Sequence, residues 1–296
     1  MRIVRGALLT GLLLAGLQSP GWGQDTLRVP RLAHPPVIDG ALAEWKGLAA
    51  NDGVWTIERL RHTPWFDATR NRATRHPAEK LGEVDLASVY YVAWDESYLY
   101  LGAEARDNAN DVTDPEPQDK RWYFKDAICW FVEAPRDTVS EPFGRGDNAF
   151  CFVIDQSRPG YAAWWRHGTA TAQYVEEPIP AAAVNYRVTM NPWGLSPGDF
   201  VLEARVRLAD TFGASDPSWK PPKVGDEYGL EIVHTDPDGG DYGGHFIVYG
   251  RGDDDATWGH MLLTAGRQQS GTTPDLKALT AADAAGAAVD STSLPR

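Results

Sequence analysis

The sequence of 296 residues lacks the short motifs by which many enzymes are recognised. It has no G-x-S-x-G around a nucleophilic serine, no H-E-x-x-H zinc signature and no glycine-rich phosphate loop. Paired carboxylates of the kind that hydrolyse glycosides meet only in space, and nothing in the sequence singles out a pair. We therefore expect no catalytic residues and a protein that is not an enzyme.

Long apolar runs are also scarce, and the one candidate stands at the start of the chain. Arg2 and Arg5 precede the apolar stretch Ala7 to Leu17, and the small-x-small sequence Gly21-Trp22-Gly23 follows. This pattern is typical of a secretory signal peptide and is too short to span a membrane, although an uncleaved anchor is the alternative. We expect residues 1–23 to be removed and the mature chain to be secreted, periplasmic or on the outer cell surface.

Positive charge is in short supply. The sequence has 28 Lys and Arg residues and 41 Asp and Glu residues, which gives a formal net charge of −13. Such a surface repels phosphate backbones and anionic lipids. We expect no nucleic-acid partner, and no stretch after the first is apolar enough to predict a membrane span.

Cysteine is almost absent. Cys129 and Cys151 are the only two, and each lies in an apolar, strand-like run, with the polar loop Pro135 to Asp147 between the runs. In an exported chain two such cysteines favour one disulfide between adjacent antiparallel strands. The alternative is a pair of buried free thiols.

Helical periodicity is nearly absent too, whereas short β-rich runs separated by turn residues are abundant. The clearest are a hairpin, Ala87 to Trp94 and Tyr98 to Arg106 around Asp95-Glu96-Ser97, and a run with clean alternation, Phe200 to Leu208. About ten to twelve such strands predict an all-β, two-sheet antiparallel β-sandwich, jelly-roll-like, with few helical turns. We expect one domain over 24–267, with a long loop excursion at 51–82 and a disordered tail at 268–296.

Several of these segments together resemble a known family. In order along the chain they are PVIDGALAEWKG, ASVYYVAWDESYLYLGAEARDN, WYFKDAICWFVE, DFVLEARVRL followed by GDEYGLEIVHTD, and WGHMLL. This series is similar to the family 9 carbohydrate-binding modules, β-sandwiches found in secreted glycan-degrading enzymes and other exported proteins. The resemblance implies a non-catalytic carbohydrate-binding protein, with an oligosaccharide or polysaccharide as its partner.

The resemblance also implies where a sugar would bind, which in the family is a slot between two tryptophans. Trp122 or Tyr123, just before Asp126, matches one of them, and Trp258 is the nearest match to the other. The family's hydroxyl-binding glutamate and arginine are replaced by the two cysteines, so these polar contacts are missing here.

Other aromatic residues extend the predicted site. Trp164 and Trp165 are consecutive, so in a strand one ring faces inward and the other outward, where it could hold a sugar face. Trp45, Trp94 and Trp130 are expected in the core. The predicted ligand-binding residues are therefore Trp122, Tyr123, Asp126, Trp164, Trp165 and Trp258.

Acidic loops raise the question of a structural Ca²⁺, which members of the family bind. Asp107 with Asp111, and Asp236 with Asp238, supply hard oxygen ligands on turn-rich segments, and Asp253 to Asp255 form a third acidic run. None matches the complete twelve-residue calcium loop, and solvated surface loops are the alternative. The three late histidines, His234, His245 and His260, are expected to be structural.

Two other functions remain open at this point. Related sandwiches hold b-type haem between a methionine and a histidine, for which Met190 or Met261 would serve here. The third possibility is a surface or assembly module whose sandwich has lost its sugar slot.

Overall fold

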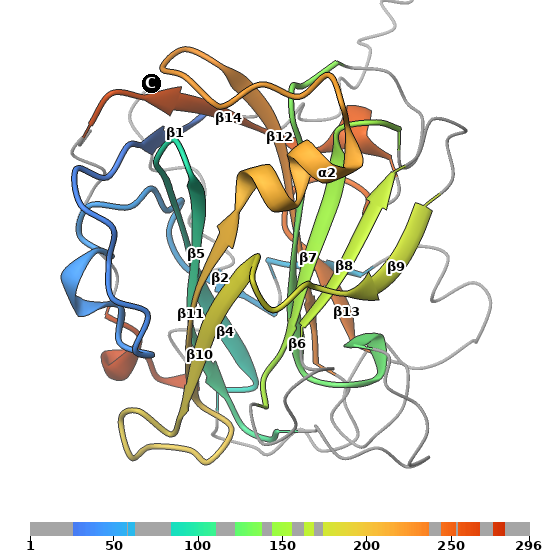
Figure 1. Cartoon of the computed structure of the whole chain (residues 1–296). Helices are drawn as coiled ribbons and strands as arrows, with labels where there is room; N and C mark the ends of the chain where they lie inside the picture. The colour runs from blue at the N-terminus through green and yellow to red at the C-terminus, as the bar shows by residue number, and fades with distance from the viewer. Residues whose placement is uncertain are drawn as a thin grey trace, which may run out of the picture.

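The molecule is a sandwich of two β-sheets packed face to face (Figure 1). The computed structural model describes residues 26–57, 59–62, 84–110, 122–137, 144–155, 163–168, 174–236, 244–252, 254–266 and 275–281. The two sheets confirm the predicted all-β sandwich. Residues 1–23, most of the excursion at 51–82, and the candidate ligands Asp111 and Asp238 lie outside the described residues.

The larger sheet, sheet A, runs in the order β1 (Leu27–Pro30), β14 (Gly259–Thr264), β12 (Glu227–Thr235), β6 (Ala127–Glu133), β7 (Asp147–Val153), β8 (Ala163–Gly168) and β9 (Tyr174–Pro178). It also holds β13 (His245–Ile247), which pairs with β12, and β3 (Arg61–His62), which pairs with β13. Sheet B runs β10 (Val184–Met190), β11 (Phe200–Arg207), β5 (Tyr98–Asp107), β4 (Leu86–Trp94) and β2 (Trp55–Thr56). Every neighbouring pair is antiparallel except β1 with β14.

Among the described residues the helical elements are single turns, and all but the last of them, which follows β14, lie between strands. They are η1 (Leu42–Glu44), η2 (Trp122–Phe124), η3 (Leu208–Asp210), α2 (Phe212–Ser215), η4 (Asp255–Thr257) and η5 (Leu276–Ala278). The predicted hairpin is confirmed, because β4 and β5 pair antiparallel along their length. Its turn is formed by the Asp95 carboxylate, which accepts hydrogen bonds from the backbone N–H groups of Ser97 and Tyr98.

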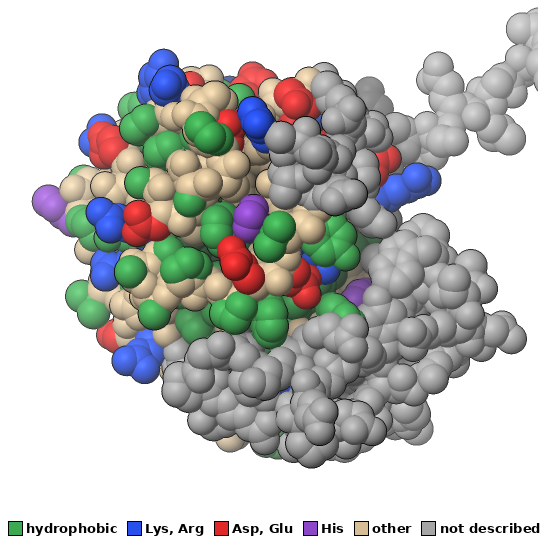
Figure 2. Space-filling view, turned by 45° about the vertical axis from the view of Figure 1, so that its right-hand side comes forward, with side chains coloured by type: hydrophobic (Ala, Val, Ile, Leu, Met, Phe, Trp, Pro, Cys, Tyr) green, Lys and Arg blue, Asp and Glu red, His purple; other side chains and the backbone are tan. Residues whose placement is uncertain are grey.

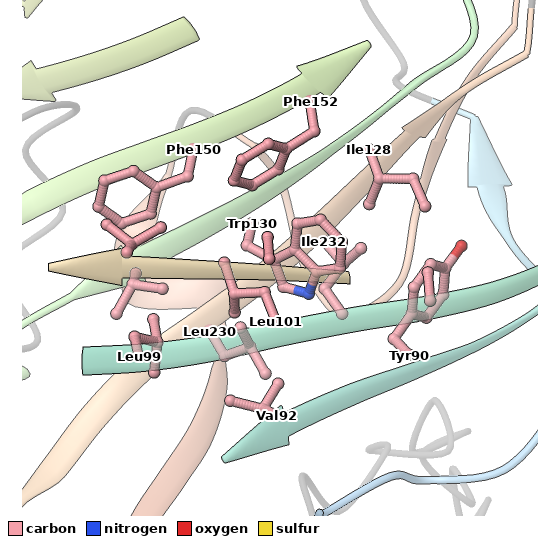
Figure 3. Packing of buried hydrophobic residues seen from close by; sticks show 14 of the residues in the cluster. Tyr90, Val92, Leu99, Leu101, Ile128, Trp130, Phe150, Phe152, Leu230 and Ile232 are labelled. Carbon is pink, nitrogen blue, oxygen red and sulfur yellow. The ribbon is translucent and has the colours of Figure 1, made fainter. Parts of the chain in front are cut away.

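The core lies between the sheets and is built from the inward residues of both. Figure 3 shows Tyr90, Val92, Leu99 and Leu101 of sheet B facing side chains of sheet A, among them Trp130. Trp130 is fully buried, and each of the labelled residues around it has an exposed fraction of 2 % or less. Burial of each large apolar side chain contributes about 1.5–3 kcal/mol. Trp45, Trp94 and Trp130 are all buried, as predicted.

The polar face of β11 is only partly the solvent face that its alternation predicts, because Arg207 is exposed and Arg205 half-buried but Glu203 is covered. Glu203 is fully buried, because the segment around η1 covers this side of sheet B. Its carboxylate accepts hydrogen bonds from the Trp45 indole at 2.6 Å and from the backbone N–H groups of Asp39 and Gly40 at 2.8 Å each. A buried charge is tolerated here because three donors converge on it.

Part of the expected disordered tail is packed against the sandwich. Leu276 in η5 is 2 % exposed and joins the cluster on the outer side of sheet B. The Arg106 guanidinium donates to the carbonyl oxygens of Leu276 and Leu279 at 3.3 and 3.2 Å. The segment therefore gains its order from a long-range contact, which its own composition does not reveal. Among the described residues no helix is long and apolar enough to cross a membrane.

Candidate functional site

The outer side of sheet A has an apolar floor that contains the disulfide. Cys129 on β6 and Cys151 on β7 lie directly opposite each other and are bonded, which confirms the predicted bridge. The floor comprises Ala127, Cys129, Phe131, Ala149, Cys151, Val153 and Val233, all buried. Alternate residues of the same strands face the core, so the two-residue period of the strands separates the floor from the core.

The short turn η2 carries two of the predicted aromatic residues onto this floor. Trp122 is 4 % exposed and stacks on His245, with ring centroids 5.9 Å apart and planes at 20°. Tyr123 meets Trp122 edge to face and is half-buried. Its carbonyl oxygen lies 2.9 Å from His245 Nε2, so the histidine fixes η2 in place.

Next to η2, strands β8 and β9 present a row of aromatic and charged side chains on the same outer side. Arg166 and Glu176 are cross-strand partners, and the Arg166 Nε donates to a Glu176 carboxylate oxygen at 2.9 Å. The guanidinium lies 4.4 Å from the centroid of the Tyr174 ring, and Tyr174 is 52 % exposed. Two positions along β8 from Arg166, Trp164 pairs with Cys151 and is half-buried.

We call Trp164, Arg166, Tyr174 and Glu176 the β8–β9 face. Figure 2 is turned so that the right-hand side of Figure 1, where β8 and β9 lie, comes forward. It shows hydrophobic side chains interspersed with acidic, basic and histidine side chains on that side of the molecule. Such a surface offers flat apolar rings together with hydrogen-bonding groups, which is the combination that recognises flat, hydroxylated molecules.

Two other predicted ligand-binding residues are buried, Trp165 on the core side of sheet A and Trp258 in the same outer cluster as Trp122. Trp165 faces the core side of β8, is 4 % exposed and donates its indole N–H to Asn148 Oδ1 at 2.9 Å. Trp258 is 2 % exposed, packs edge to face on Phe131 and donates to the Arg251 carbonyl. The structure thus brings Trp122, Tyr123 and Trp164 to one face and leaves Trp165 on the opposite one. The assignment of all of them to ligand binding stays a prediction.

Three residues of the β8–β9 face were not selected from the sequence. Arg166, Tyr174 and Glu176 come from YAAWWR and YVEEP, two short segments that only strand pairing brings together. The sequence does contain a pattern that indicates which residues share a side of β9. Tyr174, Glu176 and Pro178 alternate along β9, so they share one side of the strand, but its neighbour was not known.

Three carboxylates meet where β5 ends and β6 begins. Asp107, Asp126 and Asp236 each offer an oxygen, and these atoms lie within 4.8 Å of one another. Antiparallel pairing of Ala127 with Thr235 places Asp126 beside Asp236, and all three residues are 1 % exposed. The group contains Asp107 and Asp236 of the predicted calcium ligands, and also Asp126, which the sequence assigned to sugar binding. Its oxygens could hold a divalent cation.

Of the residues proposed for haem ligation, Met190 lies in sheet B, and Met261 and the histidines lie on strands of sheet A. Met190 is on β10 of sheet B and is 38 % exposed, whereas Met261 is fully buried on β14 of sheet A. His234 lies in the core with its Nδ1 2.9 Å from the Tyr90 hydroxyl, and His245 holds η2. These hydrogen bonds are the structural roles expected for the two histidines.

Comparison with known proteins gives a likeness of fold. No protein-family model matches the sequence, and no curated protein matches it. A family 9 carbohydrate-binding module from Caldicellulosiruptor kristjanssonii, solved with glucose, is similar over 84 % of this chain and 100 % of its own length, at 15 % identity and a TM-score of 0.50. A structure of such a module with cellotriose covers 85 % of this chain and 99 % of its own length, at 14 % identity and a TM-score of 0.49. The chain therefore has a fold like that of the family 9 modules, as its sequence motifs indicate.

Proposed function

We propose that this chain is an exported, non-catalytic carbohydrate-binding protein whose ligand lies against the β8–β9 face. The observation that carries the proposal is the cross-strand row in which Trp164 and Tyr174 flank the Arg166–Glu176 ion pair. Aromatic rings pack on the C–H side of a pyranose, while a guanidinium and a carboxylate bond its hydroxyl groups. The likeness of fold to modules solved with glucose and cellotriose supports the same class of ligand.

The ion pair in this row offers the two residue types that the family resemblance implies at the cysteine positions. Cys129 and Cys151 occupy positions at which the family resemblance implies a sugar-binding glutamate and arginine. Arg166 pairs across β8 and β7 with Ala149, two residues from Cys151. A charged pair of the same two residue types is therefore present on the same side of the sheet, displaced toward the sheet edge.

Binding measurements on point variants test this proposal. Isothermal titration with glucose and cello-oligosaccharides, and pull-down with insoluble glycans, should detect binding by the intact protein. Trp164→Ala and Tyr174→Ala should each weaken it by about tenfold or more, because the stacking of one ring contributes roughly 1.4 kcal/mol. Val175→Ala is the matched control, since Val175 is 42 % exposed on the same strand but points to the other side.

Two outcomes would overturn the assignment. If neither titration nor pull-down detects binding to any glycan tested, the proposal of carbohydrate binding is wrong. Binding that survives both ring deletions unchanged would move the site away from the β8–β9 face, with the residues around Trp122 and Tyr123 as the next surface to test. A structural Ca²⁺ at Asp107, Asp126 and Asp236 is part of the same proposal, and a melting temperature unaffected by chelator would argue against it.

A further inference from the structure

A second group of carboxylates lies at the opposite end of β6 from Asp126. Glu133 is the last residue of β6 and Asp147 the first of β7, and the two lie directly opposite each other in the sheet. A strand of seven residues is about 20 Å long, so this group is separate from the one at Asp126.

Two more acids complete the group. Asp255 opens η4 and is 3 % exposed, and Asp137 follows β6 in the loop. Oxygens of Glu133, Asp137 and Asp255 lie within 4.8 Å of one another, and Asp147 interacts with Asp255. We call Glu133, Asp137, Asp147 and Asp255 the strand-end carboxylates. Two oxygens bonded to one Ca²⁺ at about 2.4 Å are at most about 4.8 Å apart, so this spacing suits a shared ion.

The inner two acids are buried with oxygens that nothing in the described part of the chain satisfies. Glu133 and Asp147 are each 2 % exposed. Glu133 Oε1 accepts from the Asp137 backbone N–H at 2.6 Å, but among the described residues Glu133 Oε2 and Asp147 Oδ2 have no hydrogen-bond donor. Within the same residues, no ion pair to Lys or Arg involves Glu133, Asp147 or Asp255. A buried carboxylate oxygen without a donor or a cation is costly, so the group calls for a positive partner.

The residue packed beside Glu133 Oε2 is a glycine. Gly229 is the β12 residue opposite Glu133, and a Cβ at Gly229 would come within 2.9 Å of Glu133 Oε2. The Trp258 ring lies 3.5 Å from the same point and forms an adjacent wall. A glycine at this position therefore keeps a side chain from being forced against the carboxylate.

The electrostatics agree with the geometry. Burial, together with the charges of the neighbouring acids, raises the pKa of Glu133 to about 7 and that of Asp147 to about 9. Burial also raises the pKa of Asp255. Acids that repel one another in this way are stabilised either by shared protons or by a bound cation.

We propose that the strand-end carboxylates form a Ca²⁺ site that ties β6, β7 and η4 together. Oxygen-only ligands, several of them carboxylates, and two ligands supplied from loops and turns suit Ca²⁺ better than Mg²⁺, which demands a rigid octahedron at shorter distances. Of the acidic run Asp253 to Asp255, the site uses Asp255, and its other ligands come from the ends of β6 and β7 and the loop after β6, which are distant in sequence.

The test combines metal titration with neutralising variants of the full chain. After chelator treatment and dialysis at neutral pH, Ca²⁺ at about 100 times its Kd should raise the Tm of the protein by about 5–10 °C. Asp255→Asn and Glu133→Gln should each weaken Ca²⁺ binding, measured by calorimetry, by about tenfold or more. Both variants also carry Asp236→Asn, which removes a ligand from the carboxylate group at Asp126. The calorimetry then measures Ca²⁺ binding at the strand-end carboxylates alone.

Two further readouts keep the inference open to refutation. Asp254→Asn removes the same charge from the neighbouring residue and should leave Ca²⁺ binding unchanged. In the absence of metal, Asp147→Asn should melt at the same temperature as the parent or higher, because it relieves repulsion, yet lose the response to Ca²⁺. A parent protein whose Tm ignores Ca²⁺, or variants that bind it as the parent does, would overturn the site and indicate shared protons instead.

Discussion

His234 should make the sandwich sensitive to acid, and the size of the effect follows from its burial. The residue is fully buried between the sheets, with its Nδ1 2.9 Å from the Tyr90 hydroxyl. Burial lowers the pKa of His234 to about 3 from an ordinary value of 6.5. The stabilising contribution of the neutral ring is therefore complete above pH 6.5 and is lost as pH falls toward 3, because only the unfolded chain takes up the proton in that window.

The loss is about 1.36 kcal/mol per pH unit once pH is well below 6.5. Between pH 7 and pH 5 it amounts to about 2 kcal/mol of unfolding free energy. Glu231, whose pKa burial raises to about 7, changes stability in the opposite direction over the same range. The quantity to measure is therefore the difference between the protein and a variant without His234.

Urea denaturation at pH 7, 6 and 5 measures that difference. His234→Asn should be less stable than the parent at pH 7 but lose about 2 kcal/mol less on going to pH 5. Tyr90→Phe is the matched control, because it removes the hydroxyl beside Nδ1 and keeps the buried imidazole. It should lower stability by about 1 kcal/mol at every pH and keep the parent's slope. Equal slopes for His234→Asn and the parent would refute the role of desolvation.

Three further changes should alter stability in ways the structure specifies. Replacing both Cys129 and Cys151 by alanine should cost about 3 kcal/mol in urea denaturation, because the bridge closes a separation of 22 residues; a reductant should reproduce the loss in the parent and have no effect on the variant. Glu203→Ala should cost at least about 3 kcal/mol by the same assay, since the Trp45 indole and two backbone N–H groups lose their acceptor, and a loss below about 1 kcal/mol would contradict this. Gly102→Ala should destabilise the fold by about 1–3 kcal/mol through overpacking and so lower the Tm, because its Cβ would come within 3.0 Å of the Trp45 ring; an unchanged Tm would show that the segment covering sheet B can move aside.

Features that depend on neighbours in sequence were predictable. The β4–β5 hairpin follows from the two β-rich runs on each side of Asp95-Glu96-Ser97, and Asp95 forms its turn with the backbone N–H groups of the residues just after it. The bridge between Cys129 and Cys151 follows from two similar runs joined by one loop. In both cases local chemistry determines the outcome.

Features that depend on which strands become neighbours were not predictable. Glu203 alternates with apolar residues and so suggests a solvent face, but the segment at Trp45, more than 150 residues away, buries it. Asp126 lies beside aromatic residues in sequence, yet β6–β12 pairing places it next to Asp236. The pairing of Arg166 with Glu176 requires the β8–β9 register, which short irregular segments do not reveal.

The attachment of η5 to Arg106 determines from which layer the chain departs. Leu276 docks on the outer surface of sheet B, whereas the β8–β9 face belongs to sheet A. A passenger protein fused after residue 281 would therefore be attached on the side of the sandwich opposite to the β8–β9 face. Immobilisation through that end should leave the aromatic row facing outward, which makes it the preferable orientation for a sensor surface or an affinity column.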